Sequence, residues 1–165
     1  MQYFNDAVEH LSLALQIVED FVNSDQTVSA AKDRRKYVCR NLLIDTLATR
    51  AEIEMFKEQF QDSIADYMRV IELCKTYKEG NERSLASAFY CIGMANSLMA
   101  RVTEAKEAYE KAQSIYRDLL ITKLRQQGKD VSDDITYERL VEPSIFDNED
   151  VKELKRLYKD MHINA

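Results

Sequence analysis

Apolar residues recur at steps of three and four along nearly the whole chain, which is the period of one face of an α-helix. Breaks in this pattern divide the chain into six predicted helices, at 3–21, 29–57, 60–78, 82–99, 103–127 and from about Asp147 or Asn148 to His162. We find no segment with the alternating pattern of a good strand. The sequence therefore predicts an all-α fold with short connections.

Small polar residues and glycines stand at the predicted helix ends. The first break is NSDQTVS, and its Asn23, Ser24 and Ser29 are candidates for a helix stop and a helix cap. Gly80 and Gly128 follow the third and fifth helices, where a residue in the left-handed conformation commonly closes a helix. Pro143 interrupts the segment before the last helix, which Asp147 or Asn148 is expected to cap.

Three of the predicted helices share one spacing of residue sizes. A bulky residue is followed by a small one at +3, an aromatic residue or leucine at +7 and a small or apolar one at +10. The spacing starts at Phe4 in FNDAVEHLSLA, at Phe60 in FQDSIADYMRV and at Val102 in VTEAKEAYEKA. Antiparallel helices approach closely only where side chains are small, so this spacing indicates a repeated helix pair.

The helices that precede two of these segments carry a small residue at a matching place. Gly93 stands twelve positions before Ala105, and Ala51 stands twelve positions before Ser63. Glycine inside a helix costs about 0.5–1 kcal/mol relative to alanine, so Gly93 needs a packing reason. A close crossing with the following helix supplies that reason.

The pattern resembles the tetratricopeptide repeat, a helix–turn–helix unit of about 34 residues. The spacing here is longer, because Ser63 and Ala105 are 42 residues apart (105 − 63) and Ala7 and Ser63 are 56 apart (63 − 7). Together with FQDSIADY, KEG, LASAFYCIGMA and TEAKEAYEKAQSIY, this spacing resembles the SHNi-TPR family of histone chaperones. The resemblance is good over 37–120 and weak over 3–21.

The resemblance implies a chaperone that binds the core histone pair of the nucleosomal tetramer, with some members devoted to the centromeric variant. It implies work in histone storage, transport and nucleosome assembly, a nuclear and also cytoplasmic location, and no cofactor. The family carries a long acidic insert in an early repeat, which is expected either upstream of residue 1 or to have been removed. A generic tetratricopeptide adaptor between two other proteins is the alternative.

The whole chain, 1–165, is expected to form one tetratricopeptide domain. Residues 3–28 resemble the second helix of a truncated repeat, 29–80 and 81–127 two further repeats, and 128–165 a linker and a capping helix that covers the last apolar face. The chain is then expected to start within a repeat, with one face of its first helix uncovered. The sequence leaves open whether a second copy covers that face in a homodimer.

A curved helical-repeat array presents the first helix of each pair on its concave side. The side chains expected to point there are Asp45, Ala48, Thr49, Glu52 and Met55 from 44–57, and Ser87, Tyr90, Met94 and Ser97 from 86–99. Six of them are candidate partner-binding residues: Glu52, Tyr90, Asp45, Met55, Met94 and Ser87.

The carboxylates among these candidates suit lysine or arginine, Tyr90 offers an apolar face with a hydroxyl, and the methionines adapt to apolar anchors. By the resemblance, Glu52 and Tyr90 match family positions, whereas Ser87 stands where the family more often has an acid. The alternative is that all six are ordinary solvated residues. A clamp for a peptide carboxylate is disfavoured, because Glu52 stands where a base would be needed.

Composition and charge narrow the function classes further. With 3 glycines and 1 proline in 165 residues, a β-sandwich or a nucleotide-binding α/β fold is disfavoured. A formal net charge of −6 disfavours direct nucleic-acid binding. Within this acidic chain, basic residues are concentrated at 32–40. The sequence KDRRK in that segment indicates either a nuclear-import patch or a solvated helix turn. The odd number of cysteines, at Cys39, Cys74 and Cys91, favours reduced core residues in an intracellular protein.

The sequence offers no catalytic, metal or cofactor motif, so no such site is predicted and the protein is not expected to be an enzyme. His10 and His162 lie far apart, and the cysteines lack a Cys-x-x-Cys spacing. Glu52 and Glu54 are two residues apart on a helix, so they are expected to point in different directions and not to act as an acid–base pair. No apolar run is long enough to span a membrane, and no signal peptide opens the chain.

Overall fold

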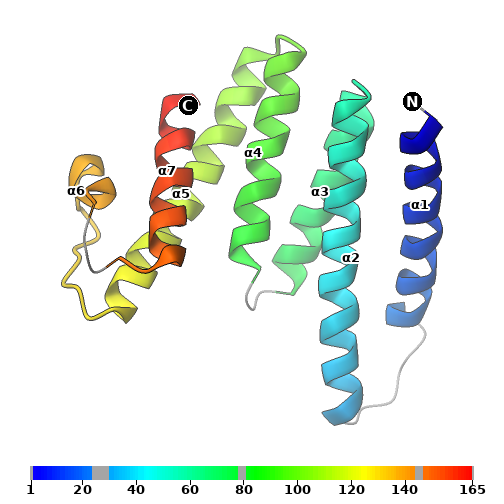
Figure 1. The fold of residues 1–165 in the computed structure, drawn as a ribbon, viewed down its shortest axis with the longest axis horizontal. Coiled ribbons are helices and arrows are strands. Elements are labelled where there is room, and N and C mark those ends of the chain that lie inside the picture. Colours follow the sequence, from blue (N-terminus) through cyan, green and yellow to red (C-terminus); the bar gives the residue numbers. More distant parts are fainter. Residues whose placement is uncertain (1, 24–29, 78–80, 144–146, 165) are drawn as a thin grey trace. The chain divides into compact units, whose positions relative to one another are not determined.

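The computed structural model describes residues 2–23, 30–77, 81–143 and 147–164, and these residues form helices without any strand (Figure 1). The helices are α1 (Gln2–Asn23), α2 (Ala30–Phe56), α3 (Phe60–Thr76), α4 (Glu82–Leu98), α5 (Val102–Gln126), α6 (Tyr137–Val141) and α7 (Glu149–Asn164). The predicted all-α fold is therefore confirmed, and six of the helices lie where the hydrophobic period placed them. Ser24, Ser29 and Gly80 lie outside the described residues.

Helix α6 was not among the six helices predicted from the sequence, so the prediction is corrected here. It spans five residues, which is too short for a hydrophobic period to be visible, and its Leu140 is fully buried. The helix ends before Glu142, since a residue that precedes proline is disfavoured in the α conformation. Pro143 therefore ends this short helix as well as interrupting the segment.

Contacts divide the chain into two compact units, Met1–Lys78 and Glu79–Ala165, and the helices of the first unit are α1, α2 and α3. Within it, α2 packs against both α1 and α3 (Figure 1). Its buried apolar side chains come from all three helices: Leu15, Leu43, Ile44, Leu47, Ala51, Tyr67, Val70, Ile71 and Cys74. Ala51 and Ser63, the small residues expected at a close helix contact, are both fully buried.

In the second unit, α5 packs against both α4 and α7, and α6 rests on α7. Gly93 of α4 faces the ring of Tyr109 on α5, where an added Cβ would lie 2.7 Å from two ring carbons. The expected packing reason for Gly93 is thus confirmed, and the close neighbour is an aromatic ring. This glycine allows α4 and α5 to hold a tyrosine between them.

Local signals at the ends of α5 and α7 are also confirmed. Gly128 has a φ of +75° and follows α5, where the Lys129 amide donates to the Leu124 carbonyl at 3.1 Å. The Asn148 side-chain oxygen accepts from the Val151 amide at 2.9 Å, so Asn148 caps α7 and Asp147 does not. Helix α7 then buries Val151, Leu154 and Tyr158 in the core of the second unit.

Within the described residues, no helix combines the length and the hydrophobicity that crossing a bilayer requires.

Candidate functional site

The candidates on α2 share one face of that helix. Asp45, Thr49 and Glu52 are exposed, and Ala48 and Met55 are half-buried. The opposite side of α2 carries the buried leucine, isoleucine and alanine residues that pack on its two neighbours. A helix with one side fixed in a core holds the other side in a defined direction. The carboxylates of Asp45 and Glu52 therefore lie on a rigid, solvated surface.

The candidates on α4 also share a face, and two of them, Tyr90 and Ser87, contact tyrosines of α5. Ser87 is exposed, whereas Tyr90 and Met94 are half-buried. The Tyr90 ring lies 5.6 Å from the Tyr109 ring at 49°, a favourable tilted contact. Burial raises the pKa of Tyr116, and the charge of Arg83 and, to a smaller extent, a hydrogen bond between the Tyr116 hydroxyl and Ser87 oppose that rise. Gly93 therefore lets Tyr109 approach α4, and Tyr109 in turn supports Tyr90.

The structure thus brings the six candidates together as two trios, each on a single helix. Asp45, Glu52 and Met55 lie in the first unit, and Ser87, Tyr90 and Met94 lie in the second. That the two trios line one concave groove stays a prediction.

A buried ionic cluster in the first unit was not predicted from the sequence. Arg50 of α2 donates from Nε and Nη2 to both carboxylate oxygens of Asp66 on α3, at 2.5 and 2.6 Å. Its Nη1 donates to the hydroxyl of Ser12 on α1 at 2.9 Å. One guanidinium therefore joins all three helices of this unit, in the two-pronged geometry that arginine makes with a carboxylate.

Glu54 lies beside this cluster and is 8% exposed. Its Oε1 is 4.0 Å from Nε of Arg50, and its Oε2 has no hydrogen-bond partner among the described residues. Burial raises the pKa of Glu54 to about 7, and the neighbouring Asp66 carboxylate adds to this effect. Glu52 is exposed, so the two glutamates do point in different directions, as the spacing predicted.

The stability of the first unit is expected to depend on pH through Glu54. The pKa of Glu54 in the folded protein lies above the ordinary value of 4.5. Its contribution to the free energy of unfolding is therefore complete below about pH 4.5 and is lost as the pH rises to about 7. Glu54→Gln should remove this loss, so the free energy of unfolding of the wild type should fall by about 2–3 kcal/mol relative to the variant between pH 5 and 8. Urea unfolding across this range measures the difference.

The matched control for this experiment is Glu52→Gln, two residues earlier on the exposed side of α2. Its difference from the wild type should stay within about 0.5 kcal/mol over the same pH range, as is usual for an exposed position. If the stability difference between Glu54→Gln and the wild type stayed constant with pH, Glu54 would not be a buried carboxyl with a raised pKa.

A second buried ionic cluster holds the connection between α5 and α7. The Asp147 carboxylate accepts from Nζ of Lys129 at 2.5 Å and from Nζ of Lys155 at 2.6 Å. Lys155 also donates to the Glu142 carbonyl at 2.6 Å. The sequence suggested Asp147 only as a helix cap, because its lysine partners lie eight and eighteen residues away.

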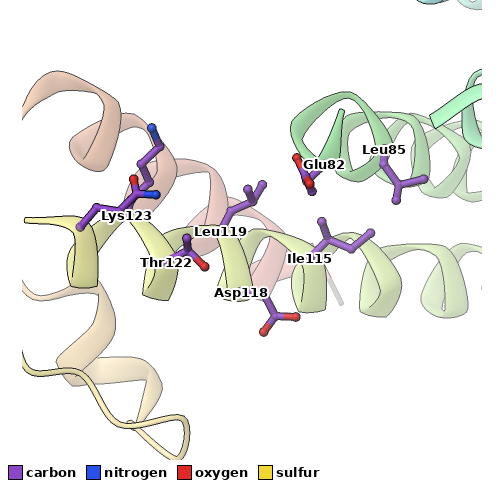
Figure 2. Close-up of a pocket in the computed structure, with 8 residues that line it drawn as sticks. Glu82, Leu85, Ile115, Asp118, Leu119, Thr122 and Lys123 are labelled. Carbon is purple, nitrogen blue, oxygen red and sulfur yellow. The ribbon is translucent and has the colours of Figure 1, made fainter. Parts of the chain in front are cut away.

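A pocket of about 480 Å³ lies between the first half of α4 and the second half of α5 (Figure 2). Its apolar side chains are Leu85, Ile115 and Leu119, all half-buried, and its charged side chains are Glu82, Asp118 and Lys123. Thr122 and Gln126 complete the lining. This pocket was not predicted from the sequence, since its residues belong to two helices and form no motif.

Searched over its described residues, the structure holds no cluster of three or more histidine, cysteine or acidic side chains that could bind a metal ion. Neither the family models nor the curated proteins include a match to this chain.

Proposed function

We propose that the protein is a histone chaperone of the SHNi-TPR type, which binds the core histone pair of the nucleosomal tetramer. The contact surface is the candidate face of the first helix in each repeat, which is α2 in one repeat and α4 in the next. The observation that carries the proposal is the repeated spacing of residue sizes with its long repeat, together with the family-like stretch over 37–120. A tetratricopeptide arrangement of the helices is part of this proposal. Storage, transport and nucleosome assembly follow as its work, in the nucleus and also in the cytoplasm.

The exposed faces of α2 and α4 supply suitable chemistry for histones, which are basic proteins. Asp45 and Glu52 present exposed carboxylates, which suit lysine and arginine of a partner. Tyr90 presents a ring held by Tyr109, which gives a rigid contact at a low entropic cost. Met55 and Met94 add adaptable apolar surface. Shielding and handing over a histone needs no ATP, and complementary charge makes such binding sensitive to salt.

The proposal predicts that Glu52→Arg and Tyr90→Ala each weaken binding to the purified histone pair by about tenfold, because one reverses an attractive charge and the other removes an aromatic anchor. Fluorescence anisotropy with a labelled histone complex measures the affinity, and circular dichroism checks that the helix content is unchanged. Equal binding by the wild type and both variants would show that the contact surface is assigned wrongly.

Two exposed positions outside the proposed surface provide matched controls. Glu72→Arg makes the same charge change on α3, and Tyr3→Ala removes a ring that is 89% exposed on α1. Both should change the affinity by less than about twofold. A pull-down from nuclear extract tests the alternative of a generic adaptor, since other dominant partners without histones would favour that function.

A further inference from the structure

We propose that the pocket between α4 and α5 binds an apolar side chain of the histone partner that is flanked by lysine or arginine. This inference rests on the proposed function and adds a second contact to it. The pocket lies within the second unit, and all of its lining residues belong to α4 and α5.

The apolar part of the pocket is preformed. Ile115 and Leu119 pack from α5 against the buried core of the second unit, and Figure 2 shows Leu85 of α4 facing them. These side chains are half-buried, so they still lose contact with water when another apolar group covers them. A volume of about 480 Å³ falls in the usual range for binding pockets and exceeds what one aliphatic or aromatic side chain needs.

The charges around this apolar part select the occupant. Glu82 and Asp118 are exposed, and their carboxylates have no hydrogen bond or ion pair with any described residue. The lining also holds one cation, Lys123, which carries a single charge against these two carboxylates and has its Nζ 3.9 Å from a further carboxylate oxygen, of Asp150 on α7. The rim is therefore acidic in effect. A lysine or arginine beside the apolar anchor fits it, whereas an acidic segment is repelled.

The pocket is separate from the contact face proposed above. Leu85 lies two residues before Ser87 and nine residues before Met94, which places it on nearly the opposite side of α4 from both. A histone segment in the pocket would therefore contact α4 on a side that the Tyr90 face does not cover. Changes at the two places should weaken binding independently, because residues that lie on opposite sides of a helix and contact different groups usually have additive effects.

The test uses the full chain, the purified histone pair and two kinds of variant. Thr122→Trp fills the pocket from an exposed position on α5, and Glu82→Lys/Asp118→Lys reverses its rim. Each should weaken binding by about tenfold, and the rim variant should also show a smaller salt dependence than the wild type. Ser114→Trp is the matched control for Thr122→Trp. The matched control for the rim variant is Glu104→Lys/Glu107→Lys, which likewise reverses one acid in the first turn of a helix and one further along α5. Both controls should stay within about twofold of the wild type.

The outcomes separate the two proposals. If the wild type binds histones, the pocket variants bind as tightly as the controls and Tyr90→Ala still weakens binding, then the pocket assignment is overturned and the proposed function stands. If the wild type does not bind histones at all, both proposals fall. If Thr122→Trp loses helix content, the rim variant decides, because both of its changes lie on exposed side chains.

Discussion

Replacing Arg50 by methionine is expected to lower the free energy of unfolding by about 3–5 kcal/mol. The change leaves the Asp66 carboxylate, on a residue only 4% exposed, without the guanidinium that meets both of its oxygens. It also removes the positive charge nearest to Glu54 and the contact with Ser12 of α1. A buried carboxylate without its partner retains the full desolvation cost. Urea unfolding followed by circular dichroism measures the loss.

The matched control for this change is Arg69→Met. Arg69 of α3 also pairs with a carboxylate of α1, that of Glu19, but the side chain of Arg69 is 46% exposed. Such a pair in water contributes at most about 1 kcal/mol. The double variant Arg50→Met/Asp66→Asn should recover part of the stability, since it removes the stranded charge. If the loss of stability at Arg50 were no larger than at Arg69, the buried cluster would not stabilise the first unit more than an exposed ion pair does.

Replacing Gly93 by valine is expected to lower the free energy of unfolding by about 2–3 kcal/mol. Even the first added carbon would lie 2.7 Å from Tyr109 ring atoms, so that the ring must move. The ring is 5.6 Å from Tyr90, so its displacement is expected to disturb Tyr90 as well. Thermal unfolding measures the stability, and the histone-binding assay measures the effect on the contact face.

Ser97→Val is the control for Gly93→Val, because it places the same side chain at an exposed position of α4. It should change the stability by no more than about 0.5 kcal/mol. The double variant Gly93→Val/Tyr109→Leu tests the cause directly, since the smaller side chain leaves room for the new one. If removing the ring does not relieve the effect of valine, the clash is not with Tyr109.

Features set by neighbours in the sequence were predicted well. The helix limits, the closing Gly128 and the cap at Asn148 depend on residues within a turn or two, and the need for space at Gly93 followed from its place inside a helix. Helix α6 escaped prediction because five residues hold little more than one turn. The contact of Arg50 with Ser12 and Asp66 escaped for another reason. These partners lie 38 and 16 residues away, and only the packing of three helices brings them together.

The candidate residues show the same division. The helical period along α2 and α4 placed the candidates on one face of each helix, because that depends only on the period and on the position of the core. It did not predict that Ser87 engages Tyr116 or that Tyr109 supports Tyr90. Those contacts depend on the register between α4 and α5. The pocket depends on the same register, and so do the three side chains that form its apolar part.

The cluster at Asp147 has a consequence for how the sequence can change over time. One carboxylate serves Lys129 and Lys155, and both lysines reach it from positions where their charge is largely withdrawn from water. Loss of Asp147 alone would leave two cations facing each other, whereas loss of one lysine would leave a balanced pair. The lysines are therefore individually replaceable and the aspartate is not. Among related chains, substitution at 147 should follow changes at 129 and 155 rather than precede them.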